Sequence, residues 1–349
     1  MSVVRSWKFW VGLLISAACI VFAFWGIDWR AFASTFGQIS WLRFCVATLW
    51  VVFVLWVRAY RWKFLVGHLK RINTYRLFQA TTIGFAVNNL LPARIGELVR
   101  SYALSRAEGL KFSGTFATVV AERIYDTMSF AFLLVLFLAS FDVPALDRLG
   151  ISQEKLTVGI ALLFVFGLAL MLLLRTKAEL VESVVRRVFG IFSRKLADRL
   201  AAEVRHFSEG ISHDLGAREV VSLVWTSLFL WVVSVFQFWL AANSLGVDLG
   251  MKHSFLLMVA VLFGISIPAS PGYVGTYHLV AMKVLQAMGY SAEIALPIAI
   301  VVHITNYITQ TALGLWNLKS IGFRLKEVTE EVASRAAEAP VGGEDSAGV

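Results

Sequence analysis

Charged side chains inside an otherwise apolar chain are the first candidates for a function here. Glu97 and Arg100 are three positions apart, and Glu122 and Asp126 are four apart, so each pair shares one face of a helix. Arginine can hold a phosphate group through two parallel hydrogen bonds. The full set of charged candidates is Arg94, Glu97, Arg100, Glu122, Arg123 and Asp126.

Two interpretations of this charged set stay open. A charged group at membrane depth costs about 2.5–3.5 kcal/mol on insertion scales, so such groups usually face a cavity and pair with one another. The set would then form a network at the inner mouth of a binding site. Alternatively, the residues lie at the cytoplasmic interface and anchor helix ends, because the set lies close to the start of an apolar run at 119–141.

Two stretches interrupted by proline and glycine lie close to these and other polar candidates. The first reads NNLLPARIGELVR over residues 88–100, and the second reads IPASPGYVGTYH over residues 267–278. Each follows an apolar run too short to span a bilayer, at 77–91 and 254–268. A pair of broken hydrophobic segments in corresponding places of two halves indicates a transporter-type binding site. Irregular backbone at membrane depth needs protein or a water-filled cavity to satisfy its polar groups.

The breaks themselves contribute neutral polar candidates. Asn88 and Asn89 precede the proline of the first break, where they either cap the broken segment or bind a ligand. The helix after that proline presents its first N–H groups to the break, and this favours anions. The second break and the last span add six binding candidates, of which the histidines could also be hydrogen-bonded packing residues: Ser270, Tyr273, Tyr277, His278, His303 and Asn306.

The elements that must position these residues are membrane helices. The chain has 349 residues, of which 58% are hydrophobic and 16% charged, and its mean hydropathy is +0.72. This composition predicts an all-α polytopic membrane protein with about six full transmembrane helices and two broken or re-entrant segments. The six apolar runs long enough to span lie near 9–27, 41–60, 119–141, 156–174, 220–242 and 293–316.

The order span, span, broken segment, span occurs twice, and the second series starts from the opposite side of the membrane, which predicts an inverted repeat. The chain then divides into a first membrane repeat at 1–141, spans four and five at 142–242, and a second broken segment with the last span at 243–320. A cytoplasmic amphipathic connector at 177–215 and a disordered cytoplasmic tail at 321–349 complete the division.

A weak internal echo supports the repeat. Val119 and Tyr125 in the third span match Val301 and Tyr307 in the sixth at one constant offset.

The distribution of charge predicts the orientation. The net charge of +9 comes from basic loops, not from a nucleic-acid surface. The loop assigned to 58–76 contains six basic residues, Arg58 and Arg61 among them, and no acid, so the positive-inside rule places it in the cytoplasm. Both chain termini then lie in the cytoplasm, and the first apolar run is an uncleaved span.

Sequence signatures of catalysis are missing. There is no H-E-x-x-H, no G-x-S-x-G, no glycine-rich nucleotide loop and no Cys/His spacing for a metal. Cys19 and Cys45 both fall in predicted spans and are interpreted as packing residues. We therefore expect neither a metal nor a cofactor, and no enzymatic activity.

The motif LPAR-x-GE-x-x-R within residues 88–100, the ER-x-x-D motif at 121–126 and the second broken stretch resemble the membrane region of lysylphosphatidylglycerol synthases. This region is also known as the flippase-like domain of UPF0104 proteins, and the resemblance covers roughly 7–320. It implies a stand-alone flippase-like protein of a bacterial inner membrane. The aminoacyl-transferase domain of the bifunctional members has no counterpart here, so lysyl transfer is not expected. The implied cargo is a phospholipid or a polyprenyl- or hopanoid-type lipid.

Two other functions stay open. A membrane phosphatase acting on polyprenyl diphosphates would also use broken Pro/Gly loops, but Ser270 has no arginine in its loop and Arg94 has no serine in its own. A non-transporting scaffold would dock envelope-biosynthesis enzymes on the connector at 177–215. The expected partners are a membrane lipid and such enzymes, and no nucleic acid.

Overall fold

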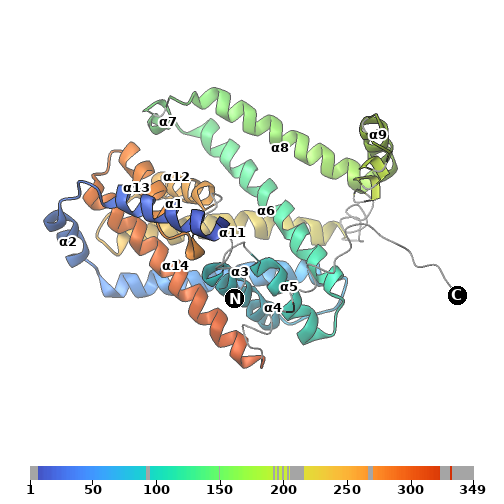
Figure 1. Ribbon diagram of the computed structural model, residues 1–349, viewed down its shortest axis with the longest axis horizontal. Coiled ribbons are helices and arrows are strands. Elements are labelled where there is room, and N and C mark those ends of the chain that lie inside the picture. Colours follow the sequence, from blue (N-terminus) through green and yellow to red (C-terminus); the bar gives the residue numbers. More distant parts are fainter. Residues whose placement is uncertain are drawn as a thin grey trace.

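The computed structural model describes residues 7–91, 95–148, 150–191, 193–194, 196–198, 200–202, 204, 216–265, 270–322 and 331. Every regular element in these ranges is helical, which confirms the predicted all-α class (Figure 1). The elements used below are α1 (Trp7–Phe24), α2 (Trp29–Gly37), α3 (Trp41–Val66), α4 (Thr74–Leu90), α5 (Gly96–Glu108), α6 (Phe112–Ser140), α7 (Pro144–Arg148), α8 (Gln153–Thr176), α9 (Ala178–Gly190), α11 (Ala217–Asn243), α12 (Gly250–Gly264), η3 (Pro271–Tyr273), α13 (Thr276–Ala287) and α14 (Ala292–Ser320).

Five of these helices are long and apolar enough to cross a membrane: α3, α6, α8, α11 and α14. A sixth span is possible if α1 and α2, which bend by 92° at the break between them, are taken together. The chain is therefore a multi-pass membrane protein, as predicted. The boundaries that differ most from the sequence prediction are those of α3, which continues to Val66, and of α6, which begins at Phe112, seven residues before the expected start.

Local capping explains where several helices begin and end. The Asn73 side chain accepts a hydrogen bond from the Tyr75 N–H at 2.9 Å and starts α4. Gly109 ends α5 with a φ of +67°, a conformation that glycine adopts without steric cost. Helices α4 and α5 pack against each other as one hairpin, and α12 and α13 pack as another.

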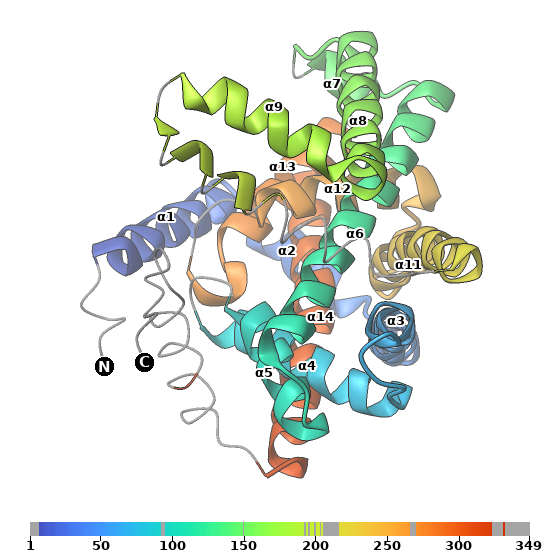
Figure 2. The same cartoon turned by 90° about the vertical axis from the view of Figure 1, so that its right-hand side faces the viewer.

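The order long helix, short helix, break, short helix, long helix occurs twice. In α3, α4, α5 and α6 the lengths are 26, 17, 13 and 29 residues. In α11, α12, α13 and α14 they are 27, 15, 12 and 29 residues. The long helices α3 and α11 lie side by side and antiparallel, since the Ser40 N–H before α3 donates to the Ser244 carbonyl oxygen after α11 at 2.8 Å. Figure 2 shows both nearly end-on.

Both hairpins close at a glycine. A Cβ on Gly84 of α4 would lie 2.8 Å from the Arg100 Cβ of α5, and a Cβ on Gly264 of α12 would lie 3.0 Å from the Val280 Cβ of α13. The glycine and its partner are 16 positions apart in each hairpin, and the two glycines are 180 positions apart. The echo noted in the sequence has an offset of 182, so it is displaced by two residues from this structural correspondence.

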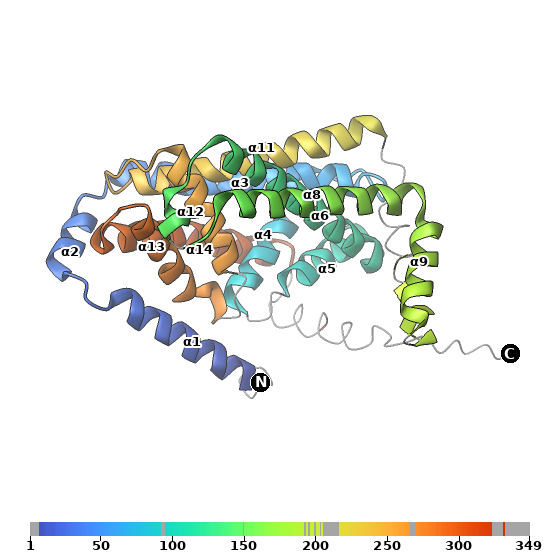
Figure 3. The same ribbon diagram turned by 90° about the horizontal axis from the view of Figure 1, so that it is seen from above.

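The remaining helices lie at the periphery. Helix α8 packs on α6 and leads into α9, which runs across the end of α8 (Figures 1 and 3). No residue of α9 is buried, and its apolar side chains Leu180, Val184 and Val188 are exposed. This agrees with an amphipathic connector over 178–190. Much of the rest of 177–215, and the tail apart from 321–322 and 331, lies outside the described residues.

Candidate functional site

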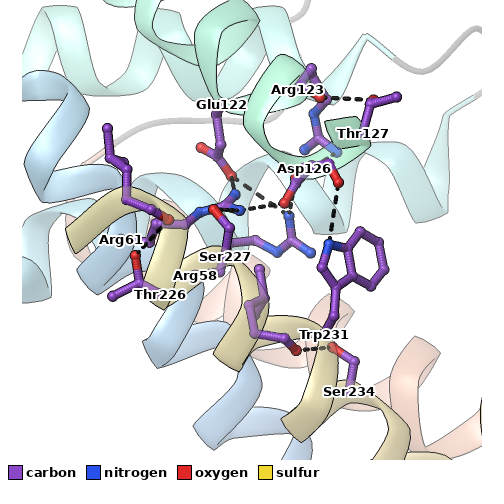
Figure 4. A network of polar contacts seen from close by, with 12 residues as sticks. Arg58, Arg61, Glu122, Arg123, Asp126, Thr127, Thr226, Ser227, Trp231 and Ser234 are labelled. Carbon is purple, nitrogen blue, oxygen red and sulfur yellow. Dashed lines mark hydrogen bonds and ion pairs between the residues drawn. The ribbon is translucent and has the colours of Figure 1, made fainter. Parts of the chain in front are cut away.

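A network of arginines and carboxylates joins α3 to α6. Arg61 of α3 is fully buried and contacts both acids of α6: one guanidinium nitrogen donates to Glu122 Oε1 at 2.7 Å, and another donates to Asp126 Oδ1. Arg58 donates to Asp126 Oδ2 at 3.1 Å and lies 3.6 Å from Glu122 Oε1. Figure 4 shows these side chains converging from the two helices. Glu122 and Asp126 therefore both contact Arg58 and Arg61, and the four side chains form one connected cluster.

Helix α5 adds a third buried arginine. Arg100 donates to Glu122 Oε2 and stacks on the Trp62 ring, with its guanidinium carbon 3.7 Å from the ring centroid. The Trp62 indole N–H in turn donates to Thr118 Oγ1 of α6 at 2.9 Å. A cation over an indole ring is stabilised by the ring quadrupole, more so when water is excluded. The re-entrant hairpin is thereby tied to both long helices of its half.

A second ion pair lies at the exposed edge of the cluster. Arg123 Nε is 3.0 Å from Glu97 Oε1, and the two side chains are 41% and 39% exposed. The Arg123 guanidinium also lies 3.7 Å from Asp126 Oδ2. This pair of Arg123 and Glu97, called the rim pair below, connects α5 with α6 at the exposed edge of the cluster.

Helix α11, from the second half, closes the other side of the cluster. Ser227 accepts a hydrogen bond from Arg61 at 3.2 Å, and the Trp231 indole N–H donates to the Asp126 carbonyl oxygen at 3.2 Å. Both residues are buried. The charged cluster is therefore assembled by four helices from both halves.

The acids of the cluster lie away from the ends of α6. Asp126 lies at the middle of α6, with 14 residues of the helix on either side. At 1.5 Å per residue, it lies about 21 Å from each helix end. Glu122 is fully buried and Asp126 is 5% exposed. The sequence had placed these residues near a boundary because the apolar run begins at 119, but the helix starts a full two turns earlier.

Two members of the cluster were assigned wrongly from the sequence. Arg58 and Arg61 were counted in a basic cytoplasmic loop, yet both belong to α3, and the loop begins only after Val66. Their charges interrupt an apolar run, so the run was ended too early. Arg58 and Arg61 are three positions apart, and the apolar residues continue to Val66 with helical spacing; this pattern could have identified a buried helix face.

The asparagines of the first break have partners within the protein. Asn88 Oδ1 accepts from the Gly96 N–H at the start of α5 at 2.7 Å. Asn89 Nδ2 donates to Thr311 Oγ1 of α14 at 3.1 Å. These contacts agree with the capping interpretation of Asn88 and give Asn89 a packing contact with α14. Arg94 lies outside the described residues.

The second break is held by contacts from several helices. Ser270 and Ser16 of α1 hydrogen-bond through their side chains at 2.8 Å. Gly272, Tyr273 and Gly275 all have positive φ, and for tyrosine this conformation is strained. A Cβ on Gly272 would lie 3.3 Å from the Asn89 carbonyl oxygen, so the two breaks touch. This contact agrees with the expectation that the broken segments meet.

A histidine pair lies beside the second break. The Gly275 N–H donates to His278 Nδ1 at 3.3 Å, and His278 Nε2 lies 3.2 Å from His303 Nδ1. The Tyr277 ring stacks on His303 at a centroid distance of 4.5 Å. Asn306 donates to the Val302 carbonyl oxygen of its own helix at 2.9 Å. These contacts support the interpretation of the histidines as hydrogen-bonded packing residues, without testing a binding role.

The predicted site residues therefore fall into two contact groups. The first is charged and contains Glu97, Arg100, Glu122, Arg123 and Asp126. The second is neutral and surrounds the second break. With the 180-residue correspondence, Arg123 and Asp126 match His303 and Asn306. The described charged residues of the cluster thus all belong to the first of the two series of helices.

The described part of the chain holds no group of three or more His, Cys, Asp or Glu side chains that could bind a metal ion. The arginines and carboxylates of the charged cluster can form ion pairs, and guanidinium groups can bind anions.

Comparison with known proteins places the chain in a family. The family described as the lysylphosphatidylglycerol synthase TM region matches residues 9–314, so the chain belongs to it. A UPF0104 membrane protein of Pyrococcus horikoshii is 27% identical over 286 residues, which cover 78% of this chain and 83% of the relative. A UPF0104 membrane protein of Methanothermobacter thermautotrophicus is 25% identical over 269 residues, covering 73% and 78%. The resemblance inferred from the motifs is confirmed.

One further relative is longer. A protein named glycosyltransferase AglD, from Haloferax volcanii, is 25% identical over 279 residues. The match covers 70% of this chain but only 43% of that protein.

Proposed function

We propose that this member of the lysylphosphatidylglycerol synthase TM region family binds a membrane lipid by its head group and moves it between leaflets. The observation that carries the proposal is the buried charged cluster halfway along α6. Buried ion pairs are costly to form and contribute little to stability compared with apolar packing, so their presence in a membrane helix bundle suggests a functional role. A lipid head group is the charged species that a bilayer itself supplies.

The roles of the residues follow from their chemistry. Arg58, Arg61, Arg100 and Arg123 would hold a head-group phosphate, since guanidinium groups bind phosphate through paired hydrogen bonds. Glu97, Glu122 and Asp126 would pair with these arginines or exchange protons. The contact between the two breaks supports a path, because irregular backbone at this depth is tolerated where it is enclosed by protein or lines a cavity. We propose that the protein moves the lipid and does not modify it.

We also propose a location and orientation. The protein would reside in a bacterial inner membrane with both termini in the cytoplasm. This orientation is supported by four exposed basic residues at the end of α3 and the start of α4: Lys63, Lys70, Arg71 and Arg76. Arg58 and Arg61 are not counted among them, because they belong to the charged cluster.

Transport in reconstituted vesicles tests the proposal. Vesicles with purified protein would receive a fluorescent phospholipid or a labelled polyprenyl phosphate on one leaflet, and the transfer rate would be compared with empty vesicles. We expect faster transfer with the wild type, a rate near that of empty vesicles with Arg100→Gln, and an unchanged rate with Lys63→Gln, an exposed charge on α3. Wild-type protein no faster than empty vesicles for every lipid would contradict translocation.

A second candidate function is a membrane partner of an envelope glycan or lipid enzyme. The similarity to less than half of the glycosyltransferase AglD favours it, because a comparable membrane region accompanies further sequence there. Deletion of 177–215, which contains the exposed helix α9, should then abolish co-purification of a partner and leave lipid transfer unchanged. The phosphatase alternative gains no support, since the described contacts of Ser270 are with Ser16 and with the loop's own backbone.

A further inference from the structure

The buried cluster contains more arginines than acids. Arg58, Arg61 and Arg100 face Glu122 and Asp126, and the side chains of these five residues are at most 12% exposed. The rim pair of Arg123 and Glu97 adds one charge of each sign. With or without the rim pair, the described side chains of the cluster sum to one positive charge. An uncompensated charge removed from water is strongly unfavourable, so the cluster is incomplete in electrostatic terms.

The hydrogen bonds show which kind of group is missing. Both oxygens of Glu122 accept from arginine, Oε1 from Arg61 and Oε2 from Arg100. Both oxygens of Asp126 do so as well, Oδ1 from Arg61 and Oδ2 from Arg58. Each of the four carboxylate oxygens of Glu122 and Asp126 is therefore paired with an arginine.

The donors, in contrast, are in excess. The Nε atoms of Arg61 and Arg100 are buried and have no hydrogen-bond acceptor among the described residues. Each guanidinium has five N–H donors in a fixed plane and no acceptor, so an arginine cannot satisfy another arginine. The missing partner is thus an acceptor, and the charge count requires it to be negative.

The exposed edge indicates where such a partner would enter. Arg58 is the buried arginine with the greatest exposure, at 12%, and Arg123 beside it is 41% exposed. Both guanidinium groups lie near Asp126 Oδ2, at 3.1 Å and 3.7 Å. An anion that reaches this edge would meet two arginines and one carboxylate.

We propose that the charged cluster is a site for a phosphate group with net negative charge and that it selects against cationic head groups. This proposal rests on the proposed function for the statement that the phosphate belongs to a lipid; the charge argument itself applies equally to inorganic phosphate. A cationic head group would add to the excess positive charge of the buried cluster instead of compensating it. A zwitterionic head group brings its own cation and leaves the excess positive charge uncompensated.

Competition binding to the full-length protein in detergent micelles tests this proposal. The probe is acyl-labelled fluorescent phosphatidylglycerol, which carries one negative charge. The competitors are unlabelled phosphatidylglycerol, phosphatidylcholine, lysylphosphatidylglycerol, diacylglycerol and inorganic phosphate. We expect phosphatidylglycerol to compete best, and lysylphosphatidylglycerol and diacylglycerol to compete at least tenfold more weakly. Competition by inorganic phosphate at concentrations similar to those of the lipid would assign the site to the phosphate group alone; its failure would assign it to a lipid head group.

Charge variants make the test specific to this cluster. Arg58→Gln makes the buried cluster neutral and should weaken phosphatidylglycerol binding roughly 10- to 100-fold, because the cluster loses the excess positive charge that a bound anion compensates. Lys63→Gln removes an exposed charge from the same helix and should leave binding unchanged. The double variant Arg58→Gln/Asp126→Asn retains Arg61, Glu122 and Arg100, restores one excess positive charge, and should regain binding.

Two results would overturn the proposal: equal competition by anionic and cationic lipids, or a double variant that binds no better than Arg58→Gln alone. These outcomes are separable from the fate of the proposed function. Selective binding of phosphatidylglycerol without transfer in vesicles would refute translocation and leave the anion site standing. Equal binding of cationic and anionic lipids, together with their transfer at equal rates, would refute the anion-selective site and leave translocation standing.

Discussion

At the scale of single residues, Arg61 organises the charged cluster. It lies between Glu122 and Asp126 and also contacts Ser227 of the second half. Its side chain is fully buried, so none of these contacts is shared with water. Removing Arg61 would leave one oxygen of each acid without its buried donor, which is far more costly than losing an exposed ion pair.

We expect Arg61→Ala to lower the free energy of unfolding by about 3–5 kcal/mol, because both acids lose a buried partner. Lys63→Ala, two positions further along α3, should change it by less than about 0.5 kcal/mol, because that side chain is exposed. Denaturant titration in detergent micelles would measure both. Equal free energies of unfolding for the two variants would show that the contacts of Arg61 do not stabilise the fold.

At the scale of elements, the α4–α5 hairpin sets the position of Arg100. Its two helices approach closely at Gly84, where a Cβ would lie 2.7 Å from the Gly96 carbonyl oxygen. Both neighbours of that Cβ, this oxygen and the Arg100 Cβ, are fixed by the α5 backbone, so a larger residue must move α5 as a unit. The stacking of Arg100 on Trp62 would move with it.

Gly84→Ala should therefore destabilise the protein by about 1–3 kcal/mol, the usual cost of overpacking, and weaken phosphatidylglycerol binding. Gly159→Ala in α8 is the matched control, since nothing lies within 4 Å of its Cβ. Alanine there should be neutral or stabilising by up to about 1 kcal/mol. Thermal unfolding and the binding assay would be run on both proteins; indistinguishable behaviour would mean that the hairpin spacing does not control Arg100.

At the scale of the whole molecule, the two series of four helices repeat the same arrangement but differ in their polar side chains. The two series of four helices have matching lengths and glycine crossings, yet one has the charged cluster and the other a histidine pair with neutral neighbours. If the second series is inverted in the membrane, the linkers that precede the two hairpins must open to opposite sides. Cysteine labelling from one side of the membrane tests this requirement.

In a background of Cys19→Ser and Cys45→Ser, single cysteines at Lys70 and Asp248 would report the two linkers. Lys70 follows α3, and Asp248 follows α11, which runs antiparallel to α3. A membrane-impermeant maleimide should label Asp248→Cys in intact cells and Lys70→Cys only after the membrane is opened. Labelling of both from one side would contradict the inverted arrangement.

Several features could be predicted from residues alone, each for a local reason. Long apolar runs identified the spans, because a bilayer accepts only segments whose backbone is satisfied internally. The Pro/Gly stretches identified the two breaks, and the i, i+4 spacing of Glu122 and Asp126 identified a shared helix face. Arg58 and Arg61 were missed because a charge within an apolar run usually marks its end.

Sequence therefore determined the all-α membrane class, the family, the two breaks and five of the seven described charged residues of the cluster, since periodicity, composition and motif depend on neighbours along the chain. Only the tertiary structure decided which charges are buried, which atoms pair, and that the cluster carries one positive charge in excess. Those properties depend on α3, α5, α6 and α11 meeting at one point. A burial cost is decided by what surrounds a side chain in space, and residues as far apart as Arg61 and Ser227 supply those surroundings here.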